Sequence, residues 1–128
     1  MISKYLKDIG VKEKDLPENW FPNDKRQSKW DKERKKHGFD SRDTWSLNFT
    51  FALWIYPRLK MYDEINIVAT TEEKYKFKDE EITMQEGIDR MLEGFNIRIV
   101  KDIYTDEDEH KVNEAFELFG FMGRSLWW

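Results

Sequence analysis

The chain has 128 residues, and its 22 lysines and arginines stand against 26 aspartates and glutamates, which gives a formal net charge of −4. This length predicts a single domain over residues 1–128 and excludes a two-domain enzyme. Aromatic residues make up 16% of the chain, so a buried core is expected even though 38% of the residues are charged. Cysteine is absent, which excludes disulfides and thiolate metal sites and agrees with a reducing compartment.

Neither export nor membrane insertion is expected. Lys4, Lys7 and Asp8 interrupt the N-terminal segment, so it lacks the apolar stretch of a secretory signal. The longest uncharged run, residues 44–57, has 14 residues, and about 18 apolar residues are needed to cross a bilayer. We therefore expect a cytoplasmic protein.

Residues 1–37 are expected to form peripheral N-terminal helices and a loop. Residues 1–10 predict a short amphipathic helix that ends at Gly10, and the two prolines within 11–24 predict a loop. Residues 24–37 have good helix formers, an acidic start and a basic last turn before Gly38. Trp30 is the only large apolar residue of this segment, so we expect the helix to lie across the surface, held by that ring.

Residues 44–65 form the apolar centre of the sequence and show two periods. Alternation over 45–55 is typical of a strand, whereas steps of three and four over 47–62 are typical of a helix. The segment is long for a strand, and its apolar residues fall all around a helix, as in a helix buried by its neighbours. We therefore favour a helix, with a kink at Pro57 or two short helices meeting near Tyr56.

Two further helices are predicted in the C-terminal part, after a loop or short hairpin over residues 66–81. The spacing of Thr83 and Glu86 indicates a capping box, and an apolar stripe at helical spacing continues to Ile103. Gly94 weakens this helix by about 1 kcal/mol relative to alanine. An acidic cap over 105–110 starts a second helix with its own apolar stripe to Met122.

These elements predict an all-α fold, a compact bundle of four to five helices. The central helix, 46–64, is kinked at its proline, and helices 84–103 and 107–122 pack around it. Residues 38–128 form the core of this single domain.

The segment 24–37 has a net charge of +4, and the remainder of the chain has −8. Its basic residues, together with tryptophan rings, have the composition of a surface that grips phosphates and stacks a base. A solvated helix explains the same charges, and the acidic chain as a whole opposes binding to nucleic acid. The candidate binding residues in this segment are Lys25, Arg26, Lys29, Trp30, Lys32, Arg34, Lys35 and Lys36.

A second candidate site lies in the apolar centre. Asn48 and Arg58 could face a pocket lined by Trp45, Trp54 and Tyr62 that accepts a small anionic ligand. The favoured interpretation is structural: the polar groups around this segment satisfy one another, and the aromatic residues form core. At the C-terminus, Trp127 and Trp128 either fill a groove of their own domain or anchor a partner.

Metal and catalytic motifs are absent from the sequence. The two histidines, His37 and His110, have no partner at metal-ligand spacing, and no nucleophile elbow or phosphate-binding loop is present. Six carboxylates could offer oxygens to Mg²⁺ between helices, but a solvated helix face explains them better. They are Glu86, Asp89, Glu93, Asp102, Asp106 and Glu109. We therefore expect no catalytic residue, no metal site and no cofactor.

Residues 38–64, GFDSRDTWSLNFTFALWIYPRLKMYDE, resemble an uncharacterised family of small proteins encoded by phages and prophages of Gram-positive bacteria. The matching elements are residues 38–40, 44–48, 55–60, 89–95 and 118–128. Ser46 and Asn48 stand where the family has Asn and Asp. The resemblance implies a helical middle segment and a phage product that acts in the cytoplasm of its bacterial host, and it implies no activity.

Three functions remain in view. The favoured one is a non-catalytic phage accessory protein that binds and modulates a host bacterial protein, such as a component of antiviral defence. The second is a nucleotide-binding or nucleic-acid-binding protein that uses the basic segment and tryptophans. The third, which carries the least weight, is an all-α, Mg²⁺-dependent nucleotide pyrophosphohydrolase. A homodimer also stays open, because terminal tryptophans and an apolar helix suit a symmetric interface.

Overall fold

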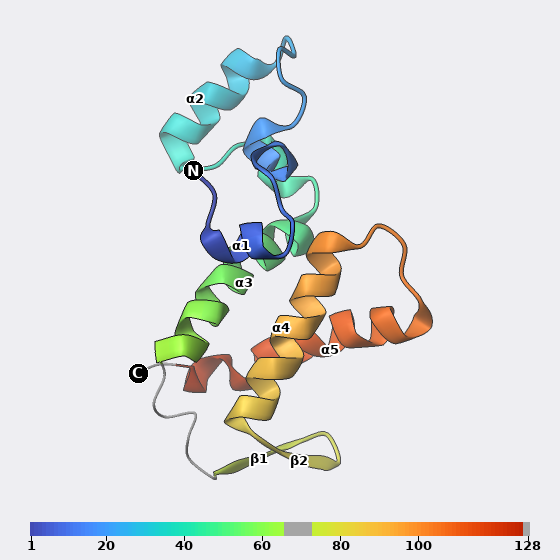
Figure 1. Cartoon of the computed structure of the whole chain (residues 1–128). Helices are drawn as coiled ribbons and strands as arrows, with labels where there is room; N and C mark the ends of the chain where they lie inside the picture. The colour runs from blue at the N-terminus through green and yellow to red at the C-terminus, as the bar shows by residue number, and fades with distance from the viewer. Residues whose placement is uncertain (66–72, 127–128) are drawn as a thin grey trace.

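The fold consists of helices and one hairpin, described by a computed structural model for residues 1–65 and 73–126 (Figure 1). The helices are α1 (Lys4–Asp8), α2 (Gln27–His37), α3 (Leu47–Ile65), α4 (Met84–Val100) and α5 (Asp106–Met122), and the strands are β1 (Lys74–Phe77) and β2 (Glu80–Thr83). Short 3₁₀ turns lie at Glu13–Asp15, Pro17–Asn19, Ser41–Thr44 and Gly123–Ser125. The predicted all-α class is confirmed.

The central segment is one helix, α3, and the prediction of a helix rather than a strand is confirmed. Pro57 lies inside this helix, so the alternative of two short helices meeting near Tyr56 is wrong. The kink at Pro57 stays a prediction. The inner side of α3 packs mainly against α4 and buries Ala52, Leu53, Ile55, Tyr56 and Leu59. Its outer side is exposed, so the expectation that neighbours surround the helix on all sides is wrong.

Helix α4 begins where its cap predicts, because the Thr83 hydroxyl accepts a hydrogen bond from the Glu86 amide at 3.1 Å. Within the described residues only this half of the predicted capping box forms. The predicted continuation of the stripe to Ile103 is wrong. Lys101 is extended and ends the helix, its ammonium binds Asp108 at 2.9 Å, and Ile103 is 87% exposed.

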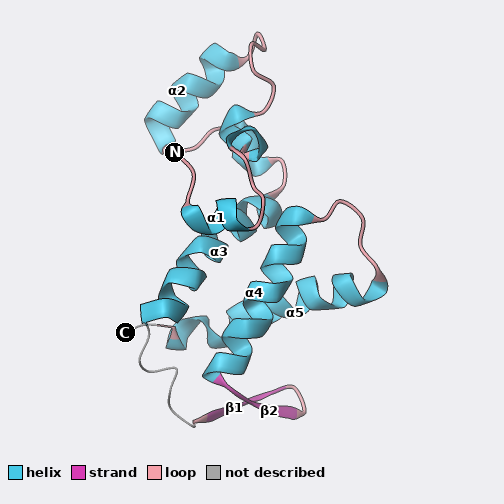
Figure 2. Ribbon diagram, viewed as in Figure 1, coloured by secondary structure: helices cyan, strands magenta, loops and turns pink. Residues whose placement is uncertain are grey.

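Helix α5 crosses α4 closely, and the two form the other half of the core. Thr105 and Asp108 exchange hydrogen bonds of 3.1 Å in a complete capping box, so the predicted start of α5 is confirmed. Phe95, Ala115 and Leu118 are fully buried between these helices and α3. The hairpin β1–β2 lies at the N-terminal end of α4, away from the α4–α5 loop (Figure 2).

For residues 66–81 we expected a loop or a short hairpin, and the structure shows a hairpin in the part of this segment that it describes. Residues 66–72 lie outside the described residues. The two N-terminal helices and the loop between them form as predicted. Helix α1 packs against α3, and the segment between α1 and α2 contains only short 3₁₀ turns. Helix α2 ends at Gly38, which is in the left-handed region at φ 85°. In the described residues no helix combines the length and the apolar character that crossing a membrane requires.

Candidate functional site

A buried ion cluster joins α2 to the start of α3. Asp40 is 1% exposed, and its carboxylate accepts hydrogen bonds from Arg42 Nε at 3.0 Å and Nη2 at 2.8 Å. Arg34 Nη2 donates to the same carboxylate at 2.9 Å and to Asp43 at 2.6 Å. Burial raises the pKa of Asp40, but the hydrogen bonds from Arg42 and Arg34 outweigh it and hold that pKa below its usual value.

This cluster shows what Arg34 and Trp30 do in the fold. Arg34, a candidate phosphate ligand, is held in ion pairs with Asp40 and Asp43. Trp30 is 1% exposed, and the Arg42 guanidinium lies 4.3 Å from its ring centre. A nucleic-acid base can stack only on an exposed ring, and the Trp30 ring is buried. The expectation that Trp30 stacks a base is therefore wrong.

The exposed basic residues of the segment 24–37 form a different set. Lys25, Lys29, Lys32, Lys35 and Lys36 are exposed, and none of them forms an ion pair with a described residue. Arg26 instead pairs with Asp24, with Nε 3.0 Å from Oδ1. Lys29, Lys32, Lys35 and Lys36 therefore give the outer surface of α2 a positive charge, and Lys25 lies just before the helix.

The structure separates Asn48 from Arg58, which the less favoured interpretation of the sequence placed at one pocket. They are ten residues apart on α3, a rise of about 15 Å. Asn48 Oδ1 accepts from Arg98 Nε at 2.7 Å, whereas Arg58 Nη1 donates to the Trp54 carbonyl at 2.7 Å. Trp45 packs against Trp20 instead, with ring centres 6.1 Å apart, so the pocket predicted around Asn48 and Arg58 is wrong.

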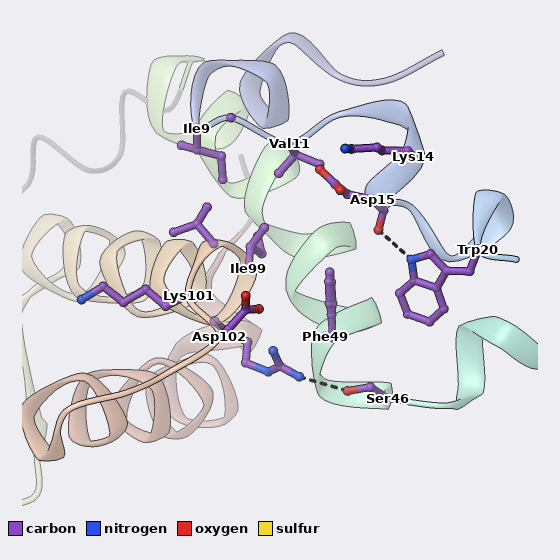
Figure 3. A pocket seen from close by; sticks show the side chains of 13 residues that line it. Ile9, Val11, Lys14, Asp15, Trp20, Ser46, Phe49, Ile99, Lys101 and Asp102 are labelled. Atoms are coloured by element: carbon purple, nitrogen blue, oxygen red, sulfur yellow. Dashed lines mark hydrogen bonds between the residues drawn. The ribbon is translucent and has the colours of Figure 1, made fainter.

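A groove of about 640 Å³ lies where α1 and the turn after it face the start of α3 and the end of α4 (Figure 3). Trp20 and Phe49 form one wall, with ring centres 6.0 Å apart and planes at 63°. The remaining lining residues are Ile9, Gly10, Val11, Lys14, Asp15, Ser46, Arg98, Ile99, Val100, Lys101 and Asp102. Trp20 is held in place by a hydrogen bond of 3.0 Å from its indole Nε1 to the Asp15 carbonyl.

Arg98 is a half-buried cation of this groove, and its hydrogen-bond partners are neutral. Its nitrogens donate to Asn48 Oδ1 at 2.7 Å, Ser46 Oγ at 3.0 Å and Tyr104 Oη at 3.4 Å. Among the residues that the structure describes, no carboxylate forms an ion pair with it. Sequence reasoning missed Arg98, because Ser46 and Asn48 are 52 and 50 residues away along the chain.

The outer side of α3 carries an apolar stripe, which we call the α3 face. It consists of Leu47, Trp54, Arg58, Met61 and Ile65, at spacings of three, four and seven residues. Leu47 is 68% exposed, Met61 53%, Trp54 51% and Ile65 47%. The Arg58 guanidinium lies 4.3 Å from the Trp54 ring centre, and no described carboxylate forms an ion pair with it. The helical period signals this stripe in the sequence but not its exposure.

The acidic and histidine candidates are dispersed. Glu93 pairs with Lys111 at 2.7 Å, and Asp89 accepts a hydrogen bond from Gln85. In residues 1–65 and 73–126 no three acidic, histidine or cysteine side chains gather in a group able to hold a metal ion. His37 stacks on Phe39 at the surface. Trp127 and Trp128 lie outside the described residues.

Comparisons of the chain with protein-family models, with curated proteins and with solved structures find no match.

Proposed function

We propose that this chain is a non-catalytic phage accessory protein that binds and modulates a protein of its bacterial host. The α3 face is the observation that carries the proposal. The resemblance of residues 38–64 supports the phage origin and a site of action in the host cytoplasm. A component of antiviral defence is the class of host protein to test first.

The α3 face has the features of a helix that docks in a partner's groove. Its apolar side chains recur at the spacing of one helix face, and the inner side of the same helix is fixed in the core. The face is therefore presented on a rigid element. Trp54 lies near its centre and is the residue type that contributes most to protein interfaces.

The charge on the α3 face indicates the chemistry of the partner. Arg58 is exposed within the apolar stripe, and its guanidinium contacts the carbonyl and the ring of Trp54. A carboxylate of the partner would pair with the Arg58 guanidinium inside an apolar surround, where such a pair gives specificity. The proposed partner surface is thus an apolar groove or helix that carries an acidic side chain.

A second copy of the chain suits the α3 face less well. Antiparallel packing of two α3 faces about their midpoint would bring the two Arg58 guanidinium groups within about one helical turn. Like charges at that spacing repel. Charge complementarity therefore favours an acidic partner over self-association.

The test begins with a photo-crosslinking residue placed at Met61 and, as a matched control, at Ile103, which is exposed on the α4–α5 loop. We expect a host protein to crosslink through position 61 and not through 103. The purified partner should bind the chain at equal stoichiometry, and Arg58→Glu should weaken binding about tenfold. Replacing the partner's facing carboxylate by lysine should restore it. Crosslinks from position 103 alone, or only to a second copy of the chain, would contradict the proposal.

Binding to nucleic acid or nucleotides is the second candidate function, and the exposed lysines of α2 favour it. Lys25 and the four exposed lysines of α2 form no ion pair with a described residue, and together they give an electrostatic footprint for phosphates. Titration with a single-stranded oligonucleotide at several salt concentrations tests it. Affinity that falls steeply with salt and is lost in the Lys29→Glu, Lys32→Glu, Lys36→Glu variant would support this function over the first.

A further inference from the structure

We propose that the groove beside Arg98 binds a small aromatic monoanion, whose anionic group pairs with the Arg98 guanidinium and whose ring lies against Trp20 and Phe49. This site is separate from the α3 face and independent of the function proposed above. Its volume of about 640 Å³ is in the range of small-molecule sites.

The charge of Arg98 supports an anionic ligand. An arginine held at a defined place usually faces a carboxylate, because paired charges offset the cost of partial burial. Here the guanidinium is fixed by the neutral oxygens of Asn48, Ser46 and Tyr104. These contacts orient the guanidinium fork, and no described carboxylate forms an ion pair with it, so its charge can recognise an incoming anion.

The aromatic and apolar walls of the groove support a ligand with an aromatic ring. The Phe49 ring lies 5.2 Å from the Arg98 guanidinium carbon, and Trp20 is edge-on to Phe49. An aromatic ring of a ligand bound here would contact the Trp20 and Phe49 rings and also the apolar side chains of Val11 and Ile99. Aromatic pairs in offset or edge-to-face geometry add to the free energy gained from burial alone.

Two carboxylates in the lining restrict the charge of the ligand. Asp15 and Asp102 line the groove, but neither forms an ion pair with Arg98. Lys14 and Lys101 also line it, and the Lys101 ammonium is bound by Asp108 at 2.9 Å. The charges of Lys14 and Arg98 balance those of the two carboxylates, so the lining offers one cation to an anionic group and no net positive charge to a polyphosphate.

The test uses 2-naphthoate as the probe, with 2-naphthamide as its neutral match and ATP as a polyanion. Binding is followed by NMR at the Trp20 indole and Arg98 Nε–H resonances. We expect 2-naphthoate to bind about tenfold more tightly than 2-naphthamide and to shift both resonances. Equal affinity for the two, tighter binding of ATP, or no shift up to the solubility limit would overturn the proposal.

A substitution of Asn48 tests the role of charge without removing Arg98. Asn48→Asp keeps the shape of the side chain and places a carboxylate at the existing 2.7 Å contact. This internal anion should compete with the ligand and weaken 2-naphthoate binding about tenfold, while 2-naphthamide is unaffected. Arg58→Gln, on the α3 face, is the control and should leave both affinities unchanged. Unaltered 2-naphthoate binding by the Asn48→Asp variant would contradict the assignment to Arg98.

Discussion

Asp40 joins α2 to the turn before α3 through its ion pairs with Arg34 and Arg42. It compensates the charge of Arg42, which is itself buried and stands over Trp30. Asp40→Asn removes that compensation and keeps the volume, so we expect the free energy of unfolding to fall by about 3 kcal/mol. Urea denaturation measures this change, and Glu93→Gln, whose exposed carboxylate pairs with Lys111, is the control that should change stability much less.

The lowered pKa of the Asp40 carboxyl group predicts that the stability of the fold depends on pH. The pKa of Asp40 is lower in the folded protein than its ordinary value of 3.8, so its contribution is fully present above that pH. It is lost as the pH falls through the lower, folded pKa. The difference in unfolding free energy between the wild type and Asp40→Asn should therefore shrink on acidification from about pH 5 to pH 2. A difference that grows over this range would contradict the role given to Asp40.

At the residue scale the sequence predicted local pairing better than distant pairing. The expectation that the polar groups around the apolar segment satisfy one another holds for the Asp40 amide, which donates to the Asp43 carboxylate. The carboxylates of Asp40 and Asp43 otherwise pair with Arg34 and Arg42, which lie within nine residues of them. The contact of Arg98 with Asn48 depends on how α3 and α4 pack, and no local pattern encodes that. Trp30 was recognised as the anchor of α2, but its burial beneath Arg42 depends on tertiary contacts.

At the scale of elements, Gly94 is required where α4 crosses α5. A Cβ atom at this position would collide with the Lys111 carbonyl oxygen and the Ala115 side chain. From helix propensity alone Gly94 counts as a weakness, whereas in the fold it permits the close approach. Gly94→Ala should lower the free energy of unfolding by about 2 kcal/mol, because backbone atoms must move.

Gly120→Ala is the matched control for Gly94→Ala. Gly120 also lies in a helix, and beyond that helix's own backbone no atom of the described residues lies within 4 Å of the place of its Cβ. This variant should be more stable than the wild type by about 0.5–1 kcal/mol. Equal changes in both variants by thermal or urea denaturation would show that the close crossing of α4 and α5 has no energetic consequence.

Local signals set the ends of the helices well where a cap was present. Thr83, Thr105 and Gly38 mark three ends that the structure confirms. Without a cap the apolar stripe was followed too far, to Ile103, because periodicity does not register the extended Lys101. The exposed side of α3 could not be foreseen either, since apolar residues around a helix predict burial on all sides.

At the scale of the whole molecule, we expect a monomer. The α3 face is apolar, yet the central Arg58 opposes pairing of two copies. Sedimentation equilibrium should give the mass of one chain for the wild type, and Arg58→Leu should increase self-association. A wild-type dimer that Met61→Asp dissociates would show instead that the α3 face joins two copies.

The most direct test of the proposed function is an NMR titration of labelled protein with the purified partner. The account predicts that resonances of Leu47, Trp54, Met61 and Ile65 shift on binding, while those of Ile103 and Phe39 stay in place. Shifts confined to the α2 lysines or to Ile103, with the α3 face unchanged, would contradict it.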